Sequence, residues 1–254
     1  MAAAAFFDLD RTLLRRSSAL ALAGTFRDRG LISRRQLAKA AAWQFLFALR
    51  GASHESVRRA AEDGLVVLRG FTPEQMRSLV AGAMERALRP LVYAEPLHLV
   101  EQHRARGERV YIVSATLQEI VEAIADDLGF DGALGTVCEV RDGAYTGRAV
   151  RALHAENKAR CVRELAAEQG LELDECTAYS DSHTDVAFLE SVGRPVGVNP
   201  DRELRRIAAE RGWPLLEFST RAYPHARRRV PPLVWGAAAL FGAGVAAGRR
   251  RRAA

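Results

Sequence analysis

The chain has 254 residues, of which 48% are hydrophobic and 27% are charged, and its formal net charge is +6. This length and apolar content suit one large domain carrying an insertion and exclude an intrinsically disordered protein. The three cysteines are far apart and odd in number, which excludes a disulfide-stapled secreted scaffold and indicates a reducing compartment.

The excess positive charge belongs to the C-terminal end of the chain. From Arg221 onward there are eight arginines and no acidic residue, which leaves 29 basic against 31 acidic residues in positions 1–220. A nucleic-acid-binding domain normally carries its positive charge on the folded body. We therefore expect no nucleic-acid partner.

The N-terminal half is predicted to be one strand followed by helices. Ala3–Phe7 is a short apolar run without a preceding basic segment, so it predicts a buried strand and not a signal peptide. Residues 14–90 are predicted to be helical, because apolar residues recur at helical spacing. The expected helical stretches are Ala19–Phe26, Leu37–Leu49, Val57–Leu68 and Met76–Leu88.

From about residue 94 the pattern alternates between strands and helices. The expected strands are Arg109–Val113, a pair within residues 133–147 around a turn at Asp142–Gly143, Cys176–Tyr179 and Pro195–Val198. The expected helices are Leu117–Leu128, Glu156–Gln169, Thr184–Ser191 and Asp201–Arg211. Such alternation predicts an α/β fold with a parallel sheet covered on both faces. We expect a core domain of residues 1–13 and 91–220, a helical insertion of residues 14–90, and a tail of residues 221–254.

The tail contains a long uncharged run. Residues 230–248 are 19 residues without a charge, flanked by arginines, and as a helix they would extend roughly 28 Å, near the ~30 Å bilayer core. Pro231, Pro232 and the many small residues make insertion marginal. Two interpretations stay open: a membrane-anchoring segment, or a tail that is disordered or packs on itself.

Acidic residues follow two of the predicted strands. Asp8 and Asp10, two positions apart, come directly after Ala3–Phe7, and Asp181 and Asp185 come after Cys176–Tyr179. Ligands of open α/β sheets bind at the carboxyl ends of the strands. Paired carboxylates there either bind a hard cation or divide the nucleophile and acid–base roles. The alternative is that these acids belong to surface loops without a catalytic or binding role.

One hydroxyl and one amine complete the set of candidate residues. Ser114 follows the strand Arg109–Val113 and precedes a helix, so it is either a phosphate ligand or a plain helix N-cap. Lys158 is one of two lysines in a chain with 35 arginines. At the start of a helix, its compact ammonium is suited to a phosphoryl oxygen, although it is equally compatible with an ordinary surface position.

Together, the order of these residues resembles the haloacid dehalogenase-like (HAD) superfamily, over residues 3 to about 215. Its four motifs match Asp8–Thr12 (the DxDx[TV] motif), Ser114, Lys158, and Asp181 with Asp185. The long helical insertion is similar to the cap of the phosphoserine phosphatase-like branch. The resemblance implies a Rossmann-like core with a parallel sheet and an inserted all-helical cap, to which this chain adds its hydrophobic C-terminal tail.

The resemblance also implies a chemistry for the acidic residues. Asp8 is the expected nucleophile that forms an aspartyl-phosphate, and Asp10 is the expected acid and base. The implied cofactor is Mg²⁺, held by Asp8, the backbone carbonyl of Asp10, and Asp181. Asp185 is expected either to bind the metal through water or to position Lys158.

The remaining motif residues are implied to bind the phosphoryl group and to support the loop. Ser114 and Lys158 are expected to contact the equatorial phosphoryl oxygens, and Thr12 to stabilise the loop that carries the nucleophile.

Three functions compete at this point. The first is a cytoplasmic phosphatase that acts on a small phosphorylated metabolite such as phosphoserine. The second is a lipid-phosphate phosphatase attached to the inner face of the membrane by residues 230–248, an idea that the apolar segment around Trp43, Phe45 and Phe47 also favours. The third is a non-catalytic regulatory protein, against which the presence of every motif side chain argues.

Overall fold

A seven-stranded sheet forms the centre of the molecule. The computed structural model describes residues 2–30, 65, 66 and 68–223. The strands lie in the order β4-β3-β2-β1-β5-β6-β7, and all neighbours are parallel except the antiparallel pair β3 and β4. The strands are β1 (Ala4–Phe7), β2 (Arg109–Leu117), β3 (Gly132–Arg141), β4 (Ala144–Arg151), β5 (Thr177–Ser180), β6 (Arg194–Val198) and β7 (Leu215–Leu216). The predicted α/β class with a largely parallel sheet is confirmed.

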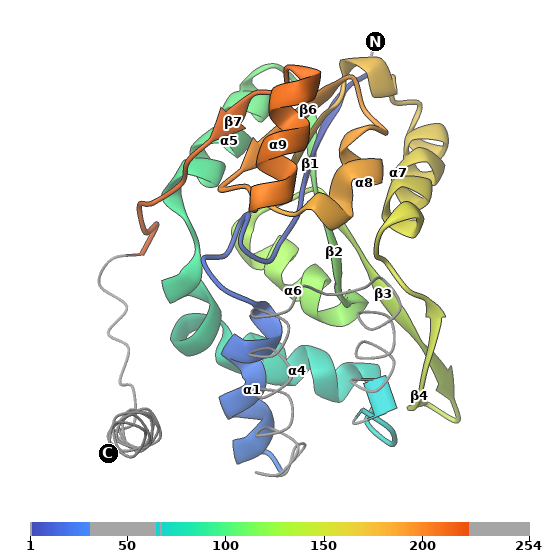
Figure 1. Cartoon of the computed structure of the whole chain (residues 1–254). Coiled ribbons are helices and arrows are strands. Elements are labelled where there is room, and N and C mark those ends of the chain that lie inside the picture. The colour runs from blue at the N-terminus through green and yellow to red at the C-terminus, as the bar shows by residue number, and fades with distance from the viewer. Residues whose placement is uncertain (1, 31–64, 67, 224–254) are drawn as a thin grey trace, which may run out of the picture.

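Helices cover both faces of this sheet (Figure 1). Helices α5 and α6 pack on one face, and α7, α8 and α9 pack on the other. Their bounds are α5 (Ala94–Ala105), α6 (Gln118–Leu128), α7 (Glu156–Gln169), α8 (Val186–Leu189) and α9 (Arg202–Arg211), with short 3-10 turns at η3 (Leu173–Glu175) and η4 (His183–Asp185).

Strand β1 lies at the centre of the sheet, and both of its faces are buried. All four of its side chains are fully buried, with Ala5 and Phe7 in one hydrophobic cluster and Ala4 and Phe6 in the other. Side chains alternate across a strand, so a continuous apolar run suits a strand that is packed on both faces. The chain leaves this strand directly into the acidic motif at Asp8.

The described part of the helical insertion lies beyond the carboxyl ends of the strands (Figure 1). It contains α1 (Ser18–Asp28), α4 (Pro73–Ala83), the π-helical turn η1 (Met84–Leu88) and the 3-10 turn η2 (Arg89–Leu91). Helix α4 begins with a capping box, in which the Thr72 hydroxyl accepts from the backbone N–H of Gln75 and the Gln75 side chain accepts from the backbone N–H of Thr72.

The two connections between the insertion and the sheet domain lie side by side. Leu14 forms an antiparallel bridge with Val92, and Tyr93 forms another with Arg221. The segment around Arg221 therefore joins the same junction. The backbone N–H of Ala222 donates to the carbonyl of Val92 at 3.0 Å. The junction between insertion and sheet domain is therefore held by three segments of the chain.

Two local expectations are corrected. Strand β2 does not end at Val113 but continues to Leu117 through an irregular register, so Ser114 lies in a strand. Helix α6 begins at Gln118 with Leu117 as its N-cap, which excludes the helix N-cap interpretation of Ser114. The expected helix Thr184–Ser191 is a 3-10 turn followed by the short α8.

Some expectations fall on residues outside the described part. The apolar segment Leu37–Leu49, most of Val57–Leu68 and the uncharged run 230–248 belong to this group. None of the helices that the structure describes is long and apolar enough to cross a membrane. The division into residues 1–13, 14–90, 91–220 and 221–254 stays a prediction.

Candidate active site

The register of three neighbouring strands brings the sequence motifs to one edge of the sheet. Phe7 pairs with Ile112 of β2 and with Tyr179 of β5. Asp8 is therefore one residue beyond these paired positions along the chain, and Ser114 and Asp181 are each two residues beyond them. The backbone N–H of Asp8 donates to the carbonyl of Tyr179 at 2.9 Å, which extends the pairing into the motif.

Lys158 lies at the centre of the site. Its Nζ donates to Asp8 Oδ1 and to Asp185 Oδ2, each at 2.7 Å, and the side chain is 2% exposed. The hydroxyl of Ser180 donates to the same Asp185 oxygen at 2.6 Å. The contact of Asp185 with Lys158 is compatible with the second of its two expected roles, the positioning of Lys158.

Burial sets the protonation behaviour of the central pair. Burial raises the pKa of Asp8 to about 7, although Lys158 acts to lower it. Burial acts against the charge of Lys158, but Asp185 and Asp8 together raise the pKa of this lysine above its ordinary value. The site thus holds one firmly charged amine beside Asp8, a carboxylate that is costly to ionise.

Asp10 is positioned by the first helix of the insertion. The backbone N–H of Ser18 donates to Asp10 Oδ1 at 2.7 Å. The Ser18 hydroxyl lies 3.1 Å from the hydroxyl of Thr116, whose backbone N–H donates to Ser114 Oγ at 3.2 Å. Burial raises the pKa of Asp10 above its ordinary value, while the contact with Ser18 lowers it. The acid and the phosphate-binding candidate are therefore linked through α1.

The loop between these acids turns sharply. The carbonyl of Leu9 accepts from the backbone N–H groups of Leu13 and Leu14, at 3.0 and 2.9 Å. Arg11 adopts a left-handed backbone with φ of 67°. Thr12 is fully buried, and its hydroxyl has no hydrogen-bond partner among the described residues.

Asp181 has a buried and incompletely paired oxygen. Its Oδ2 lies 3.2 Å from Arg11 Nε, but no described residue donates a hydrogen bond to it. Burial, and then the charge of Asp8, raise the pKa of Asp181 to about 8. A buried carboxylate oxygen that accepts no hydrogen bond from the described residues suits a further cation at this position.

The described residues supply part of the ligand set of a magnesium ion. Among the described residues, no three His, Cys, Asp and Glu side chains form a ready group of metal ligands. The expected set has only two carboxylates, Asp8 and Asp181, together with the Asp10 carbonyl. Mg²⁺ usually keeps several waters and is bound through one or two carboxylates. These donors, with the Asp181 oxygen that accepts no hydrogen bond from the described residues, therefore fit a magnesium ion.

The structure adds three residues that sequence reasoning missed: Arg11, Thr116 and Ser180. Arg11 and Ser180 stand directly beside motif acids, and this proximity was the available signal. Ser18 and Thr116 are 98 positions apart, so only the fold brings them together.

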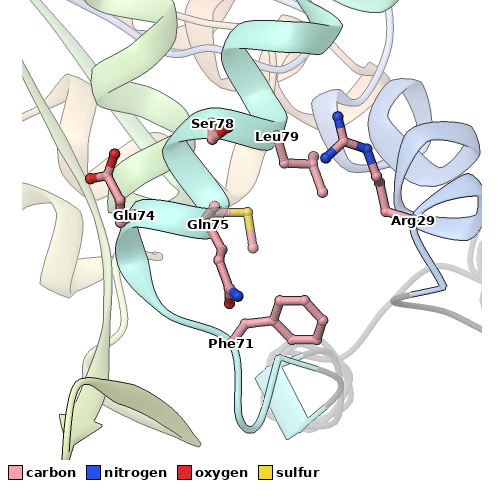
Figure 2. A pocket seen from close by; sticks show the side chains of 7 residues that line it. Arg29, Phe71, Glu74, Gln75, Ser78 and Leu79 are labelled. Carbon is pink, nitrogen blue, oxygen red and sulfur yellow. The ribbon is translucent and has the colours of Figure 1, made fainter.

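A surface pocket in the insertion lies apart from these residues. It has a volume of about 420 Å³ between the end of α1 and the start of α4, and Arg29 and Phe71 lie on two sides of it (Figure 2). None of the predicted site residues lines it.

Comparisons with known proteins agree with the expected family and with the fold. The family model described as haloacid dehalogenase-like hydrolase matches residues 5–190. A probable phosphatase of Mycobacterium tuberculosis is 44% identical over 216 residues, which cover 85% of this chain and 75% of that protein. A phosphoserine phosphatase of the same organism is 37% identical over 260 residues, with 99% and 82% covered.

One similar solved structure comes from a protein of unknown function from Bordetella pertussis Tohama I. Its TM-score is 0.74 at 32% sequence identity, and the match covers 85% of this chain and 98% of that one.

Proposed function

We propose that this chain, which belongs to the haloacid dehalogenase-like hydrolase family, is a magnesium-dependent phosphatase that hydrolyses a small phosphomonoester through an aspartyl-phosphate. The observation that carries the proposal is the contact of Lys158 with the buried Asp8. It places an amine beside the expected nucleophile, where charge on a phosphoryl group would develop. The similarity to proteins named phosphatase supports the same reaction class.

Asp8 is suited to attack phosphorus. Lys158 holds Asp8 Oδ1, whereas no described residue donates a hydrogen bond to Oδ2. Oδ2 then forms the bond to phosphorus as the bond between phosphorus and the ester oxygen breaks. Lys158 and the nearby Ser114 bind equatorial phosphoryl oxygens in this step.

Asp10 moves the proton in both halves of the reaction. It is held at a fixed orientation by Ser18 N–H, and burial favours its protonated form. It gives its proton to the leaving alcohol oxygen, and it then takes a proton from the water that attacks the aspartyl-phosphate. The second step releases inorganic phosphate and regenerates Asp8.

Asp8, the Asp10 carbonyl and Asp181 would hold the magnesium ion. When bound, the ion supplies positive charge that neutralises the repulsion between a carboxylate and a phosphate. Burial raises the pKa of Asp8 to about 7 and that of Asp181 to about 8, although Lys158 and Arg11 act to lower them, so a further positive charge beside these carboxylates would favour their ionised forms.

The proposed substrate is a small phosphorylated metabolite of the phosphoserine type. The support is the similarity to a relative named phosphoserine phosphatase, which extends over 99% of this chain. The segments that suggested a lipid phosphate, around Trp43 and in residues 230–248, lie outside the described residues.

The deciding experiment measures phosphate release by the purified full-length protein. Phosphoserine is compared with phosphatidylglycerophosphate in mixed micelles, each with Mg²⁺ and with a chelator, and Asp8→Asn serves as the inactive control. We expect Mg²⁺-dependent release with a preference for phosphoserine. Preference for the lipid contradicts the substrate class, and release that survives the chelator contradicts the metal.

We also propose that the protein is cytoplasmic and that residues 230–248 attach it to the inner face of the membrane. The uncharged run between arginine clusters supports this location. Truncation after Tyr223 keeps the contact between Ala222 and Val92 and removes residues 224–254. The truncated protein is expected in the soluble fraction and the full chain in the membrane fraction. A soluble full-length protein contradicts the attachment.

A further inference from the structure

Two cations approach the acids of the site, and they are held very differently. Lys158 is 2% exposed and donates two hydrogen bonds of 2.7 Å. Arg11 is 60% exposed, and its only described polar contact is the 3.2 Å approach of Nε to Asp181 Oδ2, which lacks hydrogen-bond geometry. Lys158 is therefore a fixed part of the site, whereas the Arg11 guanidinium is able to move.

The position of Arg11 ties it to the catalytic loop. Arg11 lies between Asp10 and Thr12, with its backbone in the left-handed region that side-chain-bearing residues rarely adopt. The turn around it is closed by hydrogen bonds from Leu13 and Leu14 to Leu9. The side chain thus starts from a defined point beside the acids and reaches outward to solvent.

The charge of Arg11 acts on Asp181. Arg11 Nε lies 3.2 Å from Oδ2 of this buried carboxylate, close enough for a direct charge interaction. A divalent cation carries twice the charge and coordinates oxygen at a shorter distance, so it displaces a half-exposed guanidinium that makes no hydrogen bond. Displacement leaves the planar donor groups of Arg11 unpaired at the site entrance, and that fork matches a carboxylate or a phosphate.

We propose that Arg11 is a specificity-determining residue. While the divalent cation is absent, the Arg11 guanidinium neutralises Asp181. When the cation binds, the guanidinium leaves Asp181 and binds a second anionic group on the alcohol portion of the substrate. The proposal deepens the proposed phosphatase function and rests on it. Cation binding and substrate choice are thereby coupled through one side chain.

The test compares Arg11→Gln with Arg16→Gln, which removes the same charge from an exposed neighbour with no described contact to the site. The first measurement is Mg²⁺ binding by isothermal titration calorimetry, without any substrate. Because Arg11→Gln removes the competitor for Asp181, it is expected to bind Mg²⁺ about tenfold more tightly than the unaltered chain and Arg16→Gln. Equal Mg²⁺ affinity in all three proteins overturns the competition between Arg11 and the cation.

The second measurement is the ratio of kcat/KM for a substrate with a second anionic group to that for p-nitrophenyl phosphate, which has none. In Arg11→Gln this ratio is expected to fall at least about tenfold, through a rise in KM. A fall with phosphoserine identifies a carboxylate as the bound group, and a fall with phosphatidylglycerophosphate identifies a second phosphate. A ratio that matches that of Arg16→Gln overturns the role in specificity.

A third variant separates charge from geometry. Arg11→Lys keeps a positive charge near Asp181 but loses the bidentate fork. It is expected to bind Mg²⁺ like the unaltered chain while showing the lowered kcat/KM ratio. If none of the proteins releases phosphate from any substrate, the proposed function fails, while the calorimetric comparison still decides whether Arg11 competes for Asp181.

Discussion

The two halves of the candidate site are built on different physical principles. In one half, Lys158 joins Asp8 and Asp185 in a buried ion cluster supported by Ser180. In the other half, Asp10 is held by a backbone N–H and by hydroxyl contacts at the junction with the helical insertion. The buried half belongs entirely to the sheet domain, so its geometry does not depend on where the insertion lies.

This difference indicates which half tolerates change. Removing one partner of a buried ion pair leaves an uncompensated charge, at a cost of about 3–5 kcal/mol. Removing one neutral hydroxyl contact costs about 1 kcal/mol. The junction half is therefore the half that is expected to tolerate single substitutions.

The largest expected effect follows from the loss of the proposed nucleophile, Asp8, in the buried half. Asp8→Asn should lower kcat by more than about 10³-fold, because the amide does not form the phosphoryl ester. Phosphate release and the thermal unfolding temperature are the measurements. A folded variant that retains a tenth of the activity would show that another residue attacks phosphorus.

Loss of the buried amine is expected to affect both activity and stability. Lys158→Met leaves Asp8 and Asp185 without their counter-charge, and we expect a loss of about 3–5 kcal/mol in the free energy of unfolding. The loss should be smaller at about pH 5, because Asp8, whose pKa is raised to about 7, is neutralised there by protonation.

Arg160→Met is the matched control for Lys158→Met, because it removes one exposed charge from the same helix. Urea denaturation at both pH values gives the comparison. Equal stability of the two variants at neutral pH would contradict the buried ion cluster.

The two acids with strongly raised pKa values make stability depend on pH and magnesium. Asp8 and Asp181 have pKa values of about 7 and about 8 in the metal-free protein, above the ordinary 3.8. The folded state therefore keeps protons that the unfolded state has already released. The stability that these protons contribute is fully present below about pH 4 and is lost as the pH rises through 7 and 8.

Magnesium is expected to offset this loss by neutralising the ionised carboxylates. The rise in unfolding temperature on adding Mg²⁺ should therefore be larger at about pH 8.5 than at about pH 6. Thermal unfolding with Mg²⁺ or a chelator measures it. The same rise at both pH values would show that the cation binds away from these acids.

The smallest expected effect concerns the hydroxyl pair of the junction half. Ser18→Ala and Thr116→Val each remove one side of the contact between the two hydroxyls, and each should lower kcat about three- to tenfold with little effect on stability. In the double variant the losses should not add, because both changes break the same contact. Thr25→Val on the same helix is the control. Additive losses would show that the two hydroxyls act independently.

Much of the fold was predictable because its signals are local. The predicted helix Glu156–Gln169 is confirmed as α7 with the same bounds, and the turn at Asp142–Gly143 separates β3 from β4. The predicted end of β2 at Val113 was wrong. The residues after Val113 continue the strand through an irregular register, which has no periodic signature in the sequence. The prediction of a site at the strand ends needed only the apolar runs that precede the acids.

The sequence by itself determined which residues carry the chemistry and in what order they occur, because a buried strand followed by acids is written in consecutive positions. The tertiary structure alone decided their partners. Lys158 meets Asp8 across 150 positions, and Ser18 meets Thr116 across 98. These contacts exist because β1 lies between β2 and β5, and the order of strands in a sheet follows from the packing of the whole core and not from any local pattern.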